Sequence, residues 1–464
     1  MVSLRSESRA TPSTWTERIE DAVLGPVRHT SPWYYVLVVF LVAVVGWGIY
    51  AYSLQFRHGL IETGMRDRIS WGLYISLFVF FIGISHAGTL VSAILRVSNA
   101  GWRTPITRIA EFITVVALLT GAFFVIIDLG RPDRLLNVII YGRWQSPIAW
   151  DVIAVTTYLA SSMVYLYLPM IPDLALFRDR AKVGVATWKK RLYRVLAVGW
   201  VGKASQMRPL SRALTILMIL IIPIAVSVHT VVSWIFGMTL RTGWNSTIFG
   251  IMFVAGAIFS GVATLTIVLA VLRKVYHLEE YITLEHFQKL AYLLAAFSLI
   301  MIYVNISEFL TTGYKLEGSE LFHFRELFVG QFAGMYWFYF YGGLMLPGLV
   351  ALYRRTRTIP FIVGAAVVVD ISMFLERYFI VVAGLRTPLM PYEAANYAPT
   401  WVEWSIMAAG FAWFALLIAL FVKVFPILAV WEIAEHHESI GGEKAPEMAV
   451  AEPSVPAKQW RVRR

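Results

Sequence analysis

A small set of ionisable side chains falls inside long apolar runs of this sequence. Inserting a charged group into the centre of a bilayer costs roughly 2.5–3.5 kcal/mol, so each of these side chains needs a partner or a role. The set consists of His86, Asp128, Asp151, His229, Glu308, Asp370, Glu376 and Arg377. These residues are the first candidates for proton transfer and ligand binding.

Two aspartates in this set are predicted to lie at similar depth. The glycine and proline of residues 128–132 end one helix just after Asp128. Ser146 and Pro147 then begin the next helix as its cap and first-turn residue, which places Asp151 in the opening turns of that helix. The sequence therefore predicts two carboxyl groups on neighbouring antiparallel helices near the outer surface.

Aromatic and basic side chains accompany these aspartates along the connector. A flat amphipathic molecule whose hydroxyl groups must lose protons, such as a quinol, suits this mixture of side chains. We expect Asp151 to act as the proton acceptor, and Asp128 to form an orienting ion pair with Arg131. The predicted quinol-binding residues are Arg131, Tyr141, Trp144 and Trp150. The structural alternative is a helix-end ion pair, a carboxylate that favours its helix N-terminus and an interfacial aromatic belt.

Two histidines are further candidates for proton transfer. His86 lies among small residues that let a neighbouring helix approach closely, and His229 follows Pro223, which frees a backbone carbonyl. Counting residues from the outer helix ends places His86 roughly 25 Å deep and His229 roughly 14 Å deep. The pair is therefore not expected to share a haem. The alternative for each is a buried histidine that is hydrogen-bonded between helices.

Four ionisable residues of the C-terminal half are predicted to form a proton path. These are Glu308, Asp370, Glu376 and Arg377. Because Glu376 and Arg377 are adjacent on a helix and point in different directions, we expect each to pair with another helix. The alternative is an ion-pair network that only locks helices together.

The composition indicates the elements that must position these groups. The 464-residue chain is 58% hydrophobic and 15% charged, and its apolar runs lack strand-like alternation. We therefore predict an all-α polytopic membrane protein with about ten transmembrane helices. They are expected at residues 33–54, 69–95, 106–128, 148–168, 213–238, 248–272, 290–310, 332–353, 359–384 and 404–424.

The distribution of basic residues predicts the orientation. Lys and Arg concentrate in the termini and the even-numbered loops, so both termini should face the cytoplasm. Residues 1–32 would form a cytoplasmic N-terminal segment and 431–464 a polar cytoplasmic tail. This topology explains the net charge of +11 without a nucleic-acid partner. Residues 170–212 mix basic and apolar side chains, as an interfacial segment or a docking surface would.

The chain has no cysteine, so it offers no thiolates to hold an iron–sulfur cluster. We expect no metal bound by this chain. Residues 78–90 and 253–265 share a weak pattern at a constant offset, which suggests a parallel repeat of four helices. The predicted organisation is a peripheral helix at 33–54, four-helix bundles at 69–238 and 248–384, and a peripheral helix at 402–430.

Several short motifs carry a resemblance to a known family. They are Ser70-Trp71-Gly72, His86-Ala87-Gly88-Thr89-Leu90, Leu129-Gly130-Arg131-Pro132, Ser146-Pro147, Trp150-Asp151, Ser227-Val228-His229-Thr230 and Arg273-Lys274. Together they resemble the NrfD/PsrC-like (polysulfide reductase) membrane subunits, and are most similar to the C subunits of alternative complex III. The resemblance covers nearly the whole apolar part of the chain.

This resemblance implies two four-helix bundles flanked by a first and a last helix. It also implies a quinol site near the outer surface of the first bundle, with menaquinol as the expected substrate. Electrons would pass to an iron–sulfur partner subunit and then to c-type haems on cytochrome subunits, beside a second related membrane subunit. Two positions depart from the family pattern: Asp128 stands where histidine is frequent, and Ile235 where an acidic residue is frequent.

We therefore expect a quinol-oxidising subunit in a bacterial inner membrane, in which Asp151 with His86 or His229 takes the protons. Coupled proton translocation is a further expectation. Two other classes of function fit the same features. One is a secondary transporter, and the other is a quinone-reducing or anchor subunit of a molybdoenzyme-type complex.

Overall fold

The computed structural model describes residues 25, 27, 30–98, 100–180, 186–388, 390 and 393–433. Within this part of the chain the regular structure is entirely helical. Most of the predicted N-terminal segment, and all but the first three residues of the predicted tail, lie outside the described residues.

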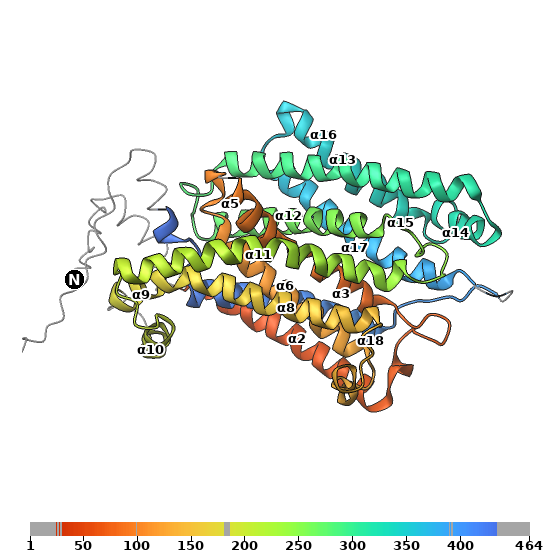
Figure 1. The fold of residues 1–464 in the computed structure, drawn as a ribbon, viewed down its shortest axis with the longest axis horizontal. Coiled ribbons are helices and arrows are strands. Elements are labelled where there is room, and N and C mark those ends of the chain that lie inside the picture. Colours follow the sequence, from red (N-terminus) through yellow and green to blue (C-terminus); the bar gives the residue numbers. More distant parts are fainter. Residues whose placement is uncertain are drawn as a thin grey trace, which may run out of the picture.

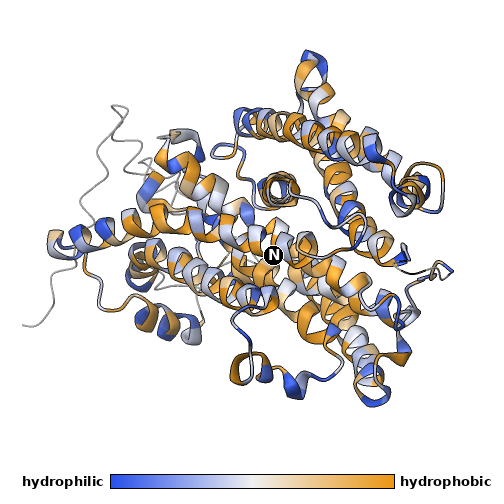
Figure 2. Cartoon of the chain, turned by 45° about the vertical axis from the view of Figure 1, so that its right-hand side comes forward, coloured by the Kyte–Doolittle hydropathy of each residue, from blue (hydrophilic) through white to orange (hydrophobic). Residues whose placement is uncertain are grey.

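Ten helical segments of the described chain are long and apolar enough to cross a membrane, as predicted. They lie side by side along the long axis of the molecule (Figure 1), with apolar residues along their lengths and polar residues mainly near the ends and in the loops (Figure 2). The segments are α2 (Pro32–His58), α3 with η2 and α5 (Leu73–Val97), α6 (Thr107–Asp128), α8 with α9 (Pro147–Asp179), α11 (Ala204–Gly237), α12 (Phe249–Val275), α13 (Leu284–Lys315), α15 with η6 and α16 (Ala333–Leu352), α17 (Ile359–Arg386) and α18 (Trp401–Val424). The all-α polytopic fold is confirmed.

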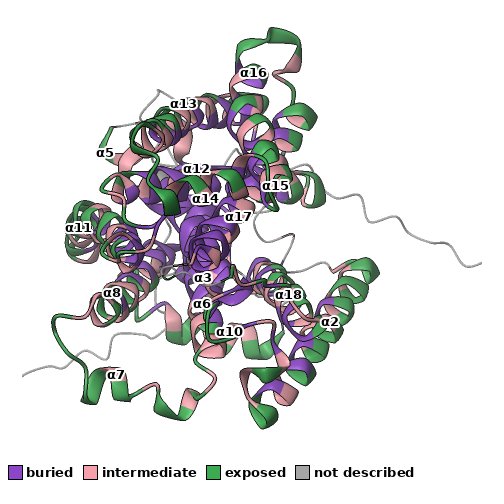
Figure 3. Cartoon of the chain, turned by 90° about the vertical axis from the view of Figure 1, so that its right-hand side faces the viewer, coloured by how far each residue is buried: buried purple, intermediate pink, exposed green. Residues whose placement is uncertain are grey.

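Helix α3 occupies the centre of the molecule (Figure 3). It packs against α6, α12 and α17, while α8 packs against α11. We call α3–α5, α6, α8 and α11 the first helix group, and α12, α13, α15–α16 and α17 the second. Helices α2 and α18 pack against each other, and α18 also contacts α6. The functional division into two bundles stays a prediction.

Local signals explain most of the helix ends. Proline occupies the first turn of α2, α8 and α17, where its missing N–H costs nothing. Thr283 and Thr400 close capping boxes at the starts of α13 and α18. Helix α11 was predicted to start at Ala213, but it begins at Ala204. Its first turns were missed because they are polar and carry no hydropathy signal.

Close helix contacts surround the short helix α4 (His86–Gly88), which continues α3. A Cβ atom on Gly88 would lie 2.3 Å from Thr114 Oγ1 of α6, and one on Gly261 of α12 would lie 2.6 Å from Ala87 N. Only glycine permits these approaches. Just beyond them, η2 (Thr89–Ile94) is a π-helical segment, and such wide turns are frequent at functional sites. These close approaches therefore lie next to an irregular helical segment.

Candidate functional site

The two predicted histidines meet at the centre of the first group. Their ring centroids are 4.2 Å apart and the rings are nearly perpendicular, at 81°. The predicted difference in depth is wrong, because counting residues along each helix assumes level helix ends, and these ends are not level. The contact between the rings leaves no room for a haem between them. Both imidazoles are almost completely buried.

The hydrogen bonding of the two rings differs. His86 Nε2 lies 3.0 Å from the carbonyl oxygen of Ala225, and Nδ1 lies 3.3 Å from that of Ile82. Among the described residues, His229 has no hydrogen-bond partner on either ring nitrogen. His86 is thus held by helix α11, while His229 keeps a free nitrogen lone pair beside it.

Tyr158 of α8 completes this central cluster. Its ring centroid lies 5.7 Å from that of His86. Its hydroxyl donates to the carbonyl oxygen of Ser85 at 3.0 Å and lies 2.7 Å from Thr89 Oγ1. Tyr158 was not predicted as a site residue, because the free energy of inserting a tyrosine into a membrane span is too small to distinguish it within an apolar run.

Asp151 lies in the second turn of α8, as predicted. The residue is 8% exposed, and one carboxyl oxygen is buried without a hydrogen-bond partner. Beside it, the Trp150 indole donates to the carbonyl oxygen of Trp144 at 2.5 Å and stacks edge-on with Trp234 of α11 at 6.3 Å. An unpartnered carboxyl group next to an aromatic wall is suited to proton transfer.

The buried face of α8 is unusually polar. Almost all of its buried residues carry hydroxyl or carboxyl groups, at helical spacing along one side. They are Asp151, Tyr158, Ser162 and Tyr165. These four residues are separated by seven, four and three positions, a helical spacing of polar side chains that could have been found from the sequence alone.

Asp128 is the last residue of α6, and one of its carboxyl oxygens is also buried without a partner. Its titratable neighbours include Tyr74 of α3 and Glu403 of α18. Tyr74 in turn donates to Gln55 of α2 at 2.7 Å. Asp128 therefore faces α2, α3 and α18, and the structure does not bring it into hydrogen-bonding contact with Asp151.

The predicted ion pair between Asp128 and Arg131 is wrong. The Arg131 guanidinium is exposed and binds Asp133 through two hydrogen bonds, each of 3.1 Å. This contact lowers the pKa of the Asp133 carboxyl. The reason is Gly130, whose positive φ of 64° turns the chain out of the helix, so that helical spacing no longer applies.

Tyr141 and Trp144 lie on the connector that follows. Each is 76% exposed. The connector and its short helix α7 (Asn137–Ile140) stand away from the helix groups (Figure 3). Of the four predicted quinol-binding residues, only Trp150 lies against the helices beside Asp151.

The predicted proton-path residues of the second group form separate contacts. Glu376 and Arg377 bind each other at 2.6 Å, a contact that was not expected. Glu376 also interacts with the side chain of Tyr339 of η6, as expected of a residue that pairs with another helix. The arginine side chain is long enough to bend back to its neighbour, and it also covers the Phe253 ring at 4.7 Å. Asp370 accepts a hydrogen bond from Thr264 at 2.8 Å.

Glu308 lies apart from these residues, at the end of α13. It accepts a hydrogen bond from Ser246 and lines a hollow of about 340 Å³ beneath α14 (Gly318–Phe328). The predicted path is therefore not one continuous chain of contacts.

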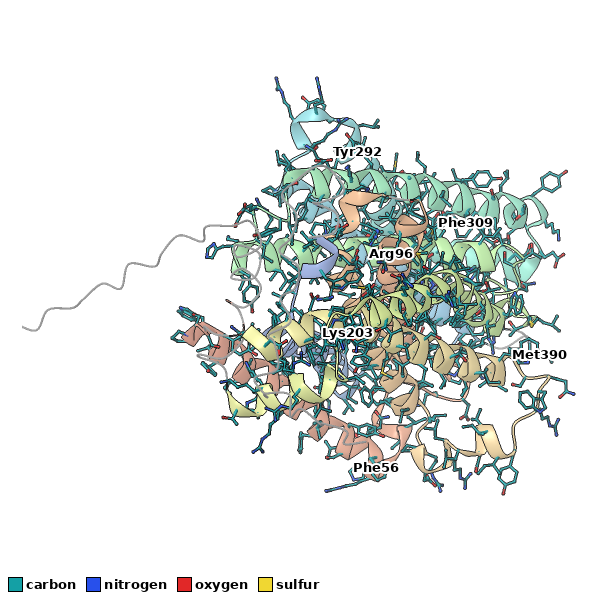
Figure 4. The ribbon with its side chains drawn as sticks, turned by 60° about the vertical axis from the view of Figure 1, so that its left-hand side comes forward. Phe56, Arg96, Lys203, Tyr292, Phe309 and Met390 are labelled. Atoms are coloured by element: carbon teal, nitrogen blue, oxygen red, sulfur yellow. The ribbon has the colours of Figure 1, made fainter. Side chains whose placement is uncertain are left out.

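A second polar cluster, missed from the sequence, lies at the opposite end of the first group. Ser92 of η2 donates a hydrogen bond to the Glu111 carboxyl of α6, and its hydroxyl oxygen lies 3.0 Å from the Tyr165 hydroxyl of α8. Arg96, which is labelled in Figure 4, binds Glu432 at 3.3 Å. The sequence analysis overlooked Glu111 because it lies only one turn inside the predicted helix, where a carboxyl group is ordinarily solvated.

Comparison with known proteins identifies the family of this chain. A family model described as polysulphide reductase, NrfD, matches residues 61–388, which include both helix groups and the histidine pair. The chain belongs to the NrfD family. The resemblance carried by the motifs is thus confirmed, and the chain is a multi-pass membrane protein of this family.

Named relatives of this NrfD-family chain occur in archaea and bacteria. The putative dimethyl sulfoxide reductase membrane C subunit of Halobacterium salinarum is 33% identical over 50% of this chain and 49% of its own length. The selenate reductase C subunit of Mesobacillus selenatarsenatis is 25% identical over 85% and 94%. The Hdr-like menaquinol oxidoreductase integral membrane subunit of Archaeoglobus fulgidus is 24% identical over 88% and 98%. The match thus spans about half of the first relative and nearly all of the other two.

Proposed function

We propose that this chain is the quinol-oxidising membrane subunit of an alternative complex III-like oxidoreductase. In this proposal it binds menaquinol or a related quinol and holds no redox centre itself. Electrons leave to an iron–sulfur partner subunit and then to c-type haems on cytochrome subunits. Relatives named as a menaquinol oxidoreductase subunit and as C subunits of reductases support a quinol as the substrate.

The observation that carries the proposal is the buried Asp151 carboxyl group with a free oxygen atom. Oxidation of a quinol breaks two O–H bonds and releases two electrons. Asp151 takes one proton, and the pair of His86 and His229 takes the other, since His229 has free ring nitrogens. The burial of these groups keeps bulk water from competing for the protons.

The remaining candidates have supporting roles in this proposal. Trp150 forms an aromatic wall for the quinol ring. Arg131, Tyr141 and Trp144 are exposed and act at the entrance to the site or on a partner subunit. Asp128 stands in place of the histidine frequent in the family and acts as a further proton-accepting group. Glu308, Asp370, Glu376 and Arg377 serve coupled proton movement in the second group.

The membrane orientation follows from charge. Arg96, Arg103 and the basic helix α10 (Thr187–Leu196) lie at one end of the helix groups, which we call the basic end. By the positive-inside rule this end faces the cytoplasm of a bacterial inner membrane, and Asp151 lies near the outer surface. The electron-accepting partner therefore docks on the outer side.

The test uses the purified complex with menadiol as the electron donor. In the wild type, menadiol should reduce the co-purifying haems or clusters. Asp151→Asn should slow this reduction at least about hundredfold, the low end of what positioned proton transfer contributes. Asp133→Asn, which alters an exposed aspartate of the same connector, should leave it unchanged. Equal rates for Asp151→Asn and the wild type would remove Asp151 from the reaction.

A further inference from the structure

A large groove lies between the peripheral helices and the second group. It has a volume of about 1020 Å³, and side chains of α2, α12 and α18 line it. Helices α2 and α18 pack against each other at the edge of the molecule (Figure 3), whereas α12 packs on α3, α11, α13 and α17. The groove therefore separates the peripheral pair of helices from the second group.

The wall of this groove is mostly apolar. Leu37 and Leu41 of α2 line it from one side, and Val268 and Val271 of α12 line it from the other. Val271 is 54% exposed and Leu37 is 47% exposed. Pockets for small ligands measure roughly 300–1,000 Å³, so the groove matches the largest of them. Its size and its aliphatic wall suit acyl chains.

The length of the groove limits what can occupy it. Along α18 it extends from Phe414 to Lys423, which is about 14 Å at 1.5 Å per residue. The hydrocarbon core of a bilayer is about 30 Å thick, and each leaflet contributes half of it. A transmembrane helix of a partner needs the full thickness, whereas the acyl chains of one phospholipid need a single leaflet. The length therefore favours a lipid.

Lys423 lies at one end of the groove and brings a positive charge into it. The residue is 8% exposed, and its ammonium group lies over the rings of Tyr34, at 4.9 Å, and Tyr276, at 5.6 Å. Both tyrosines also line the groove, and the Tyr34 hydroxyl donates to the carbonyl oxygen of Ala419 at 3.2 Å. An ammonium group has three donors, so it can bind a phosphate oxygen while it stays over the two rings.

A second lysine lies beside this end of the groove. Lys189 of α10 donates to the carbonyl oxygen of Lys423 at 2.8 Å and to that of Val27 at 3.4 Å, so this end of the groove belongs to the basic end. Among the described side chains that line the groove, none is acidic. Trp33 lines it next to the two tyrosines, and such aromatic residues are enriched at the level of lipid headgroups. This combination of charge and aromatic rings suits the phosphate group of an anionic lipid.

We propose that the groove binds one anionic diacyl phospholipid, with its phosphate group at Lys423 and its acyl chains between α12 and the pair of α2 and α18. The lipid fills the space that separates these helices and holds the peripheral pair on the second group. In the membrane orientation proposed above, it belongs to the cytoplasmic leaflet, where anionic lipids attract basic side chains. The site is separate from Asp151 and the histidine pair.

The experiment uses the purified complex and a phosphatidylglycerol that carries a photoactivatable diazirine on one acyl chain. After illumination, peptide mass spectrometry identifies the labelled residues. Lys423→Gln removes the charge, and Lys423→Arg keeps it. The control is Lys274→Gln, because Lys274 is an exposed lysine in the last turn of α12 that does not line the groove.

A second pair of variants changes the shape of the groove and no charge. Ala415→Trp places a large side chain in the groove, since Ala415 is exposed and lines it. Ala408→Trp is the matched control, because Ala408 is an exposed residue of the same helix that lies outside the groove. Unlabelled phosphatidylglycerol and zwitterionic phosphatidylcholine compete with the label in each complex.

In the wild type, the label should attach to residues 267–275 and 414–422, and phosphatidylglycerol should displace it better than phosphatidylcholine does. Lys423→Gln should reduce this labelling about fivefold, the effect of one basic side chain beside an anionic headgroup, and Lys423→Arg should retain most of it. Ala415→Trp should also reduce it, and both controls should equal the wild type. If Lys423→Gln fails to assemble, the competition between the two lipids in the wild type decides.

Equal displacement by the two lipids would identify ordinary boundary lipid and overturn the proposal. Displacement by menaquinone alone would assign the groove to a quinone tail, and an unlabelled groove would mean that protein covers it; either result would also overturn the proposal. Labelling does not require oxidation of menadiol. The lipid site can therefore be tested even if the proposed function fails.

Discussion

The two helix groups bury similar kinds of polar side chains but connect them differently. In the first group, hydroxyl, phenol and carboxyl groups form two separate contacts between helices, one between Thr89 and Tyr158 and one that joins Ser92 with Glu111 and Tyr165. In the second, Glu376 and Arg377 neutralise each other, and Asp370 and Glu308 each bond to a single hydroxyl. The burial of polar side chains alone therefore does not show whether they conduct protons or only stabilise the packing of the helices.

The difference lies in what each group would lose with one side chain. Removing one side chain from a hydrogen-bonded chain interrupts proton transfer. Its neighbours keep their hydrogen bonds to other hydroxyl groups. Removing one member of a buried ion pair leaves an uncompensated charge. Mutations in the first group should thus act mainly on the rate, whereas loss of one member of the ion pair in the second group should also reduce stability.

The largest expected effect on stability tests the ion pair of the second group. Glu376→Gln should destabilise the protein by about 3–5 kcal/mol, because Arg377 would remain buried and charged. The double variant Glu376→Gln with Arg377→Met should recover much of that loss. The measurement is thermal unfolding in detergent. A single variant as stable as the wild type would show that the pair is not a support.

A pH-dependent effect is expected at the end of the second group. Burial lowers the pKa of His323, in α14, to about 4, from 6.5. Between pH 4 and pH 6.5 the His323 imidazole binds a proton in the unfolded state but not in the folded state. The free energy of unfolding therefore has its full value above pH 6.5 and falls by roughly 3 kcal/mol as the pH drops toward 4.

His323→Gln should flatten this decline. Melting temperatures at pH 7.5 and pH 5 give the comparison, and the difference between the two values should shrink in the variant. The measurement at pH 7.5 serves as its own control for any loss of packing. An undiminished difference would assign the acid sensitivity to other groups.

A smaller loss should follow from crowding the centre of the first group. Gly88→Ala places a methyl group 2.3 Å from Thr114 Oγ1 and should cost about 1–3 kcal/mol. Gly46→Ala in α2 is the matched control, since a Cβ atom there meets nothing within 4 Å. Equal melting temperatures for the two variants would mean that α3 and α6 can move apart freely.

The smallest effect is expected outside both groups. Arg131→Ala removes an exposed ion pair with Asp133 and should leave the melting temperature within experimental error. If menadiol oxidation also continues at the wild-type rate, Arg131 has no place in the quinol site. A large loss of activity without loss of stability would return it to the site.

Much of the fold could be predicted because hydropathy is a local property. All ten spans were predicted from runs of apolar residues, and α8 was predicted to begin at Ser146 and Pro147, as it does. The polar first turns of α11 and the short helix α14 were missed because they carry no apolar run. Helix existence needs only the sequence, whereas helix ends beyond the bilayer need tertiary contacts.

The site was harder to predict because it depends on relative placement. The sequence identified Asp151, His86 and His229, yet separated the histidines, because nothing local fixes the offset between α3 and α11. Arg131 was paired with Asp128 by helical spacing that Gly130 interrupts. Glu111 and Tyr165 could have been found from the periodic spacing of polar residues on three helices, which apolar runs conceal.

The last described residues carry a consequence for biosynthesis. Glu432 supplies the carboxyl group for Arg96 and Arg103, and the backbone oxygen of Leu428 accepts from the almost fully buried Arg108 at 3.0 Å. A ribosome makes these residues after every membrane span. The three arginines must therefore wait for their final partners until translation is nearly over, so a chain that stops short of residue 428 should be marked for degradation even though all ten spans have been made.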